Sequence, residues 1–150
     1  YKLLVVSNQP GIAQGYFDCA AVERAGKALI DMLAAAGAKV DGFYYCPHFP
    51  GAGTAEYSMR CSCRKPRPGL LHAAAVEHDI DLENSWMVGD ILNDVEAGKR
   101  AGCRTVLVDR GNETEWLPGP FREPDIVLRS LEGLPTHIRQ DYQLKISGTK

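Results

Sequence analysis

CPHFPGAGTAEYSMRCSCRKPRP, residues 46–68, is the stretch around which we expect the fold to be organised. It contains three of the five cysteines and one of the four histidines, within a segment interrupted by Pro and Gly. One C-x-H pair opens the stretch, and one C-x-C pair follows near its end. Two such pairs can close a tetrahedral site around one ion, and a donor set of thiolates and imidazole favours zinc over magnesium or calcium. The predicted zinc ligands are Cys46, His48, Cys61 and Cys63.

Two alternatives to a zinc site stand beside this prediction. Free cysteines are often small buried hydrophobic residues, and cysteines can also form disulfides. The cysteines of a C-x-C pair seldom bond to each other, and an odd total of five favours a reducing cytosol. We therefore expect the ion to hold the loop and to position the basic pair that follows it, Arg64 and Lys65.

Length and charge limit the class of protein. A chain of 150 residues fits one domain and can bury a core, and 45% hydrophobic with 24% charged residues is ordinary for a globular protein. The formal charge of −2 gives no electrostatic reason to expect nucleic acid or an anionic membrane as a partner. No apolar run approaches the length of a membrane span, and the first residues lack the features of a signal peptide. We expect a cytoplasmic monomer.

Short apolar runs alternate with helical patterns along the chain. This alternation predicts an α/β fold with a parallel sheet, helices on both faces and right-handed crossovers. The expected strands are residues 3–6, 43–45, 85–88, 104–108 and 125–128. The expected helices are residues 20–36, 69–78, 91–101 and 131–138, with Asp18 as an N-cap and Gly37 and Gly102 as stops. The tail at 141–150 is polar and is expected to fray.

Polar residues follow three of the predicted strands. The segment Ser7, Asn8, Gln9, Pro10 follows the first strand, the zinc loop follows the second, and Asp90 follows the third. Because ligands of open parallel sheets bind at the carboxyl ends of the strands, we expect these groups to meet at one edge. Alternative interpretations are a simple turn at Ser7 and Asn8, and a solvated surface charge at Lys65. Asp90 and Asp94 could also be acids favoured by a helix N-terminus.

Together these side chains suit a phosphate ester. A hydroxyl and an amide at a turn can donate hydrogen bonds to phosphoryl oxygens, and a fixed Lys65 can neutralise their charge during transfer. The carboxylate of Asp90 can hold Mg²⁺, and the planar fork of Arg64 can bind a phosphate or sugar hydroxyls.

Four motifs carry a resemblance to a known family. They are S-N-Q-P-G-I-A-Q-G, Y-Y-C-P-H-F-P, C-S-C-R-K-P-R-P-G and V-G-D-x-x-x-D. With them the chain resembles the haloacid dehalogenase superfamily, in its small, capless, zinc-containing branch. That branch holds the D,D-heptose 1,7-bisphosphate phosphatases and the related histidinol-phosphate phosphatases. The resemblance covers residues 3–110.

The resemblance implies a Mg²⁺-dependent phosphomonoesterase that works through an aspartyl-phosphate. Its substrate would be a phosphorylated sugar on the route to nucleotide-activated heptose, a lipopolysaccharide precursor. In this family pattern Ser7 binds phosphate, with Asn8, Gln9 and Pro10 beside it. Lys65 stabilises the phosphoryl group and Arg64 recognises the substrate. Asp90 ligates Mg²⁺, Asp94 supports it, and the zinc set is structural.

The sequence departs from the family pattern at two points. The family carries D-x-D-G-T on an earlier strand, with the nucleophile and the general acid/base, and this motif is absent from residues 1–150. We therefore expect an N-terminally shortened phosphatase domain that is inactive alone and unstable without its central strand. Ile91 stands where the family often has a basic residue after the metal-binding aspartate.

The sequence is compatible with three alternative functions. The leading hypothesis is removal of the C7 phosphate of a heptose bisphosphate. Histidinol-phosphate phosphatase is the first alternative, because it shares the zinc loop and R-K-P. The second alternative is a zinc-stapled phosphate-binding module without turnover, which the missing D-x-D favours.

Overall fold

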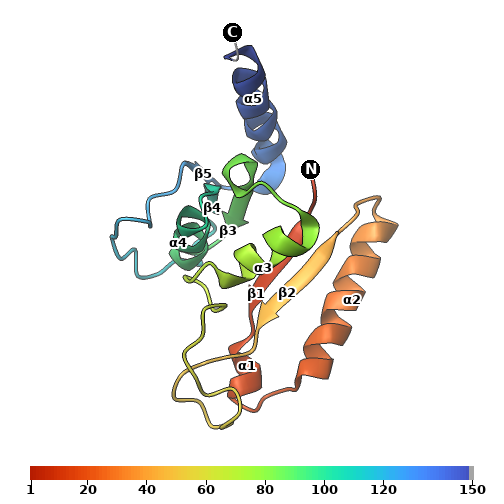
Figure 1. Cartoon of the computed structure of the whole chain (residues 1–150), viewed down its shortest axis with the longest axis vertical. Coiled ribbons are helices and arrows are strands. Elements are labelled where there is room, and N and C mark those ends of the chain that lie inside the picture. Colours follow the sequence, from red (N-terminus) through yellow and green to blue (C-terminus); the bar gives the residue numbers. More distant parts are fainter. Residues whose placement is uncertain (149–150) are drawn as a thin grey trace. The chain divides into compact units, whose positions relative to one another are not determined.

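The computed structural model describes residues 1–148, and its contacts divide the chain into two compact units. The first unit is Tyr1–Leu82, and the second begins at Glu83. The five strands all pair in parallel, in one sheet of two strands in the first unit and one of three in the second. Figure 1 shows the elements of both units along the chain.

The first unit is built on two neighbouring strands. β1 (Leu4–Asn8) pairs with β2 (Gly42–Cys46) in a register that runs from Leu4 opposite Gly42 to Asn8 opposite Cys46. The last residues of the two strands are therefore direct neighbours. The helices of this unit are α1 (Pro10–Ala13), α2 (Cys19–Ala35) and α3 (Gly69–His78).

Alternation along β2 explains why helices cover both faces of this sheet. Phe43 lies against Gly26 of α2, where a Cβ atom would collide with the phenyl ring. Tyr44, the next residue, points to the other face, where its hydroxyl donates to Glu77 of α3 over 2.7 Å. Because successive strand residues face opposite sides, α2 and α3 pack on opposite faces.

The ends of α2 follow from its sequence. The Asp18 carboxylate accepts a hydrogen bond from the Ala21 amide at 2.7 Å, as an N-cap does. After the helix, Gly37 adopts a φ of 83°, the left-handed conformation that commonly ends helices at glycine.

The second unit is a three-stranded sheet with a compact core. β3 (Trp86–Gly89) and β5 (Ile126–Leu128) flank β4 (Arg104–Val108), and α4 (Leu92–Arg100) connects β3 to β4. Leu92, Val95 and Leu107 form a buried cluster between α4 and β4. The short 3₁₀ helices are Leu82–Asn84 and Leu131–Gly133, and α5 spans Leu134–Ser147.

The predicted α/β class with parallel strands is confirmed, and the structure differs from the local predictions near both ends of the chain. The first strand, expected at 3–6, continues through Ser7 and Asn8 as part of β1, so these two residues form no turn. Residues 10–13, where no helix was expected, form the short helix α1, because Pro10 occupies its first position, where its missing N–H is not needed. The helix expected at 131–138 is present as the 3₁₀ helix followed by α5, but α5 continues to Ser147, where a frayed tail was expected. An ion pair between Asp141 and Arg104 of β4 holds this helix in its unit. The last two residues of the predicted tail lie outside the described residues.

No helix in the part of the chain that the structure describes combines the length and the apolar character needed to cross a membrane.

Candidate metal centre and phosphate-binding groups

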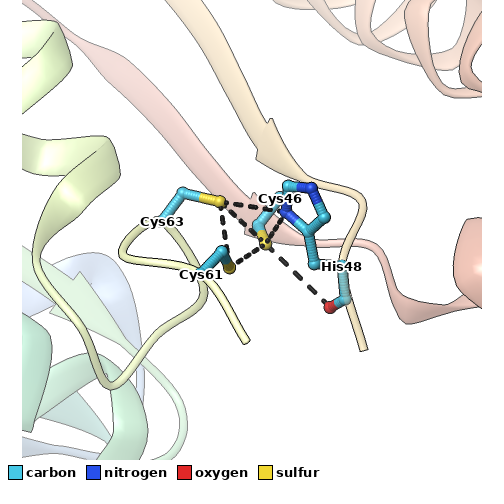
Figure 2. A group of neighbouring side chains, drawn as sticks. All are labelled: Cys46, His48, Cys61 and Cys63. Atoms are coloured by element: carbon cyan, nitrogen blue, oxygen red, sulfur yellow. Dashed lines mark hydrogen bonds between the residues drawn. The ribbon is translucent and has the colours of Figure 1, made fainter. Parts of the chain in front are cut away.

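The four predicted zinc ligands converge on one point. Figure 2 shows the sulfur atoms of Cys46, Cys61 and Cys63 turned toward each other and toward the imidazole ring of His48. The ligand atoms all lie within 4.8 Å of one another. The sequence identified all four residues, and the structure adds that Nδ1 is the ring nitrogen that faces the sulfur atoms.

The distances fit a tetrahedral zinc site. With Zn–S bonds of about 2.3 Å and Zn–N bonds of about 2.0–2.1 Å, a tetrahedron places two sulfurs about 3.8 Å apart, and a sulfur about 3.6 Å from the nitrogen. The three S–S distances here are 3.5, 3.1 and 3.3 Å. The two S–N distances are 3.6 and 3.4 Å. The cluster is thus slightly tighter than a zinc tetrahedron, and it can accept the ion by a small outward movement.

The thiols of this cluster differ in acidity. Burial raises the pKa of Cys46, and burial together with the neighbouring thiols raises the pKa of Cys63. Burial also acts to raise the pKa of Cys61, but hydrogen bonds from Cys63 and from the Arg64 amide outweigh it, so this pKa lies below the ordinary thiol value. The Arg64 amide lies 3.3 Å from the Cys61 sulfur. Because zinc binds thiolates, its binding displaces protons from this cluster.

The loop between the ligands has no buried core of its own. Of the residues from 47 to 69, all of which the structure describes, none is buried. Most of its main-chain hydrogen bonds close tight turns, and longer links include Phe49 N–H to Tyr57 O at 3.1 Å and Thr54 N–H to Ala13 O at 2.9 Å. Cys46, by contrast, is fully buried at the end of β2. A metal clamp is therefore the natural stabiliser of this loop.

Lys65 is tied to the end of β1 by three hydrogen bonds. Its amide donates to Asn8 Oδ1 over 3.0 Å, and Asn8 Nδ2 donates back to the Lys65 carbonyl over 3.0 Å. The ammonium group donates to the Val6 carbonyl over 2.9 Å. The structure thus brings together two segments that are far apart in sequence, as predicted for the first two strand ends.

The end of β1 and the start of α1 are joined by Gln9, whose hydrogen bonds order this segment. Gln9 Nε2 donates to Ser7 Oγ over 2.8 Å, and the Gln9 amide donates to the Cys46 carbonyl over 2.8 Å. Pro10 begins α1 directly after them. The Ser7–Pro10 segment is therefore attached to the end of β2 that carries Cys46, the first predicted zinc ligand.

Arg64 lies along the zinc loop. Its guanidinium stands 4.8 Å from the centre of the Phe49 ring, and Nη1 donates to the His48 carbonyl over 3.4 Å. Stacking on an aromatic face orients a guanidinium without neutralising it. Arg64 is therefore oriented by Phe49 and by the carbonyl of His48, a predicted zinc ligand.

In the second unit, Asp90 follows β3 directly and is exposed. Its amide donates to Asp94 Oδ2 over 3.2 Å, and Asp94 is only 4% exposed. Gly89 makes this possible, because a Cβ atom there would collide with the Asp94 side chain. An exposed carboxylate at a strand end is a donor of the hard oxygen type that Mg²⁺ requires, so Asp90 fits that ion.

Two residues near Asp90 were missed from the sequence. Asn112 Nδ2 donates to Asp90 Oδ2 over 2.7 Å, and Glu113 Oε2 accepts from the Leu92 amide over 2.7 Å. Both lie in a polar loop without periodicity, where sequence gives no indication of a contact. The one indication in the sequence was Gly111, which follows the fourth strand. In the structure this glycine adopts a φ of 85°.

Known proteins resemble this chain over most of its length. A family model described as HAD-hydrolase-like matches residues 62–134. The D-glycero-beta-D-manno-heptose-1,7-bisphosphate 7-phosphatase of Pseudomonas aeruginosa is 34% identical over 140 residues, which are 93% of this chain and 75% of the relative. The enzyme of the same name from Escherichia coli K12 is 40% identical over 144 residues, 95% of this chain and 74% of the relative.

Two solved structures that resemble this chain carry phosphatase names, like the sequence relatives. The D,D-heptose 1,7-bisphosphate phosphatase of B. bronchiseptica, complexed with magnesium and phosphate, is 34% identical and superposes with a TM-score of 0.77. The match covers 93% of this chain and 75% of that one. A putative HAD-like phosphatase from Mesorhizobium loti gives a TM-score of 0.76 at 34% identity, covering 92% of this chain and 64% of its own. The chain therefore belongs to the haloacid-dehalogenase-like phosphatases, in the family of the D-glycero-beta-D-manno-heptose-1,7-bisphosphate 7-phosphatases.

Proposed function

We propose that this chain belongs to a Mg²⁺-dependent phosphatase that removes the C7 phosphate of D-glycero-D-manno-heptose 1,7-bisphosphate. The observation that carries the proposal is the pair of hydrogen bonds between Asn8 and Lys65, which seats the predicted phosphate-binding lysine at the end of β1. The substrate comes from the relatives, which share 34–40% identity over at least 93% of the chain and carry this activity in their names. Such a product would serve the synthesis of activated heptose for lipopolysaccharide.

Each phosphate-binding residue has a proposed task. The ammonium group of Lys65 neutralises charge on the phosphoryl oxygens, where a preorganised positive group has its largest effect on the barrier. Ser7 Oγ and Asn8 contact the same oxygens, and the turn through Gln9 and Pro10 keeps them in place. Arg64, stacked on Phe49, recognises the sugar or its second phosphate by its planar set of donors.

The two metals have separate proposed tasks. Zinc on Cys46, His48, Cys61 and Cys63 fixes the loop that carries the basic pair. Mg²⁺ on Asp90, when bound, supplies charge that polarises a phosphoryl oxygen. Asp94 keeps the Asp90 main chain in place through the 3.2 Å hydrogen bond. Neither task depends on the other metal, so chelating zinc and omitting Mg²⁺ should affect activity independently.

The family's D-x-D-G-T motif is not among these residues, so we propose that residues 1–150 by themselves bind phosphate without turning it over. We also propose that both units belong to one phosphatase domain, which works as a cytoplasmic monomer without nucleic acid or membrane partners. No observed feature favours histidinol phosphate over the heptose bisphosphate.

The test is phosphate release from D-glycero-D-manno-heptose 1,7-bisphosphate by the natural enzyme that carries this sequence. We expect Mg²⁺-dependent release of one phosphate, with the C7 phosphate lost and the C1 phosphate kept. Histidinol phosphate is the comparison substrate. A higher kcat/KM for histidinol phosphate, or release of the C1 phosphate, would refute the proposed substrate.

Lys65→Ala tests the task proposed for the Lys65 ammonium group, and it keeps the main-chain hydrogen bonds to Asn8. We expect kcat to fall by roughly 10²–10³-fold, about 3 kcal/mol, the usual effect of losing one preorganised electrostatic donor. Arg60→Ala is the matched control, because Arg60 is an exposed cation of the same loop. Zinc content should stay unchanged in both variants. A Lys65→Ala enzyme as active as the Arg60→Ala control would remove Lys65 from the mechanism.

A further inference from the structure

The loop after β4 reaches the proposed magnesium ligand. β3 and β4 are parallel neighbours, with Gly89 opposite Leu107, so residues that follow β4 emerge beside Asp90. The chain then turns at Gly111, whose φ is 85° and whose amide donates to Asp109 Oδ1 over 3.2 Å. This turn directs Asn112 and Glu113 toward the junction between β3 and α4.

Glu113 holds the start of α4. This helix begins after Ile91, which has no side chain that can cap it. Glu113 Oε2 accepts from the Leu92 amide over 2.7 Å, and Oε1 accepts from the Glu115 amide over 3.0 Å. The first of these bonds lowers the pKa of Glu113, so the carboxylate is ionised where the helix presents its positive end. A cap from a distant loop replaces the local one that the sequence lacks.

Asn112 contacts the proposed metal ligand, Asp90, directly. Its amide donates to one carboxylate oxygen of Asp90, Oδ2, over 2.7 Å. The main chain of Asp90 is held separately, through its own amide, by the buried Asp94. Asp90 is thus fixed at its backbone from inside the unit and at its carboxylate from the loop.

We propose that Asn112 and Glu113 are positioning residues for the metal site. Asn112 orients the Asp90 carboxylate, and Glu113 holds the helix start on which Asp90 depends. The proposal rests on the proposed role of Asp90 as the Mg²⁺ ligand. An exposed carboxylate rotates freely in water. When one of its oxygens accepts a hydrogen bond from an amide that is itself held in place, the carboxylate is kept in one orientation. Partners of metal ligands commonly change metal affinity by roughly 10–100-fold when they are removed.

The experiment measures metal binding directly, with Mn²⁺ as the probe. The natural enzyme is loaded with zinc, stripped of Mg²⁺ and titrated with Mn²⁺, and free Mn²⁺ is followed by its electron paramagnetic resonance signal. The variants are Asp90→Asn, Asn112→Ala and Asn112→Gln. Thr114→Ala is the matched control, since Thr114 is an exposed residue of the same loop.

We expect Asn112→Ala to weaken Mn²⁺ binding roughly 10-fold, the lower end of the range because the bond is exposed. Its kcat should approach the wild-type value at saturating metal, with the change confined to the metal dependence. Asn112→Gln keeps an amide donor and should recover part of the affinity. Thr114→Ala should bind Mn²⁺ like the wild type.

Asp90→Asn separates the possible failures. If this variant loses Mn²⁺ binding while Asn112→Ala binds as tightly as the wild type, the positioning role is overturned and the proposed ligand stands. If Asp90→Asn binds Mn²⁺ unchanged, the ligand assignment is overturned and the positioning proposal with it.

Glu113→Gln is tested by hydrogen exchange at the Leu92 amide. We expect exchange there to rise roughly tenfold, with exchange in the buried part of α4 unchanged, and Mn²⁺ binding to weaken in parallel. Unchanged exchange at Leu92 together with wild-type Mn²⁺ affinity would contradict the role of Glu113.

Discussion

The zinc loop, residues 46–68, and the Asp90 region, residues 89–113, hold their functional groups in opposite ways. From 47 to 69 the described chain buries no residue, and it is held by four side chains that can share an ion and by hydrogen bonds such as those between Asn8 and Lys65. The Asp90 region instead contains a buried core of Leu92, Val95 and Leu107. Beside it, the buried Asp94 holds the Asp90 amide, and Asn112 of the loop after β4 holds the Asp90 carboxylate. We infer that a metal adds most to the order of a loop without a core, and adds little to a strand end beside one.

Cys63→Ser should weaken zinc binding strongly, because it removes a ligand from the region without a core. Structural zinc binds with about 10–16 kcal/mol, so one ligand of four accounts for about 3 kcal/mol, or roughly 100-fold in affinity. Zinc affinity is measured by competition with a chromophoric chelator. Cys19→Ser is the control, because Cys19 lies outside the cluster and bonds to the Tyr57 hydroxyl at 3.5 Å. Equal zinc affinity in the two variants would remove Cys63 from the site.

Leu107→Ala tests the Asp90 region, whose functional groups lie beside a buried core. Leu107 is 0% exposed, and truncating such a residue costs about 2–5 kcal/mol of unfolding free energy. We expect this loss in urea denaturation followed by circular dichroism, with zinc affinity unchanged. Leu117→Ala, at a position that is 54% exposed, should have little effect on stability. A loss of zinc binding in Leu107→Ala would show that the metal loop depends on this core.

Asp125→Asn should have a smaller effect that depends on pH. Burial acts to raise the pKa of Asp125, but hydrogen bonds from Lys99 and Thr105 outweigh it and leave the pKa below its ordinary value. A depressed carboxyl pKa adds stability above the unfolded-state pKa, about 3.9, and this stability is lost as the pH falls through the folded-state pKa. The variant should therefore be about 1 kcal/mol less stable than the wild type at pH 7.

The difference between the two proteins should shrink as the pH falls below about 4. Urea denaturation at several pH values between 3 and 7 measures it. A difference that stays constant over this range would mean that ionisation of Asp125 does not contribute to stability.

Much of the fold could be predicted because its signals are local. The helix Gly69–His78 and the strand Arg104–Val108 follow apolar runs bounded by clear breaks, and both were predicted with these bounds. The length of α5 could not be predicted, because Leu144 and Ile146 are exposed and give the helix no apolar face to recognise. Its anchor is the ion pair from Asp141 to Arg104, which is a tertiary contact.

The candidate site also combines residues with a local sequence signal and residues that meet only through tertiary contacts. The zinc ligands can be predicted from their spacing, because a C-x-H pair and a C-x-C pair within one loop have few other uses. The contacts of Asn8 with Lys65, and of Asn112 with Asp90, arise only when parallel strands bring distant segments together. Asn and Glu in polar loops are common, so such partners are visible only in the structure.

We expect zinc to add to the hydrogen bonds that hold Arg64 and Lys65 in place, whereas the Asp90 region should need no zinc. Amide hydrogen exchange of the natural enzyme, with zinc bound and after chelation, tests it directly. We expect the amides of Arg64 and Lys65, which donate to Cys61 Sγ and Asn8 Oδ1, to exchange at least about tenfold faster without zinc. The amides of Leu92 and Val95 should keep their protection. Unchanged protection at Arg64 and Lys65 after complete removal of zinc would contradict this expectation.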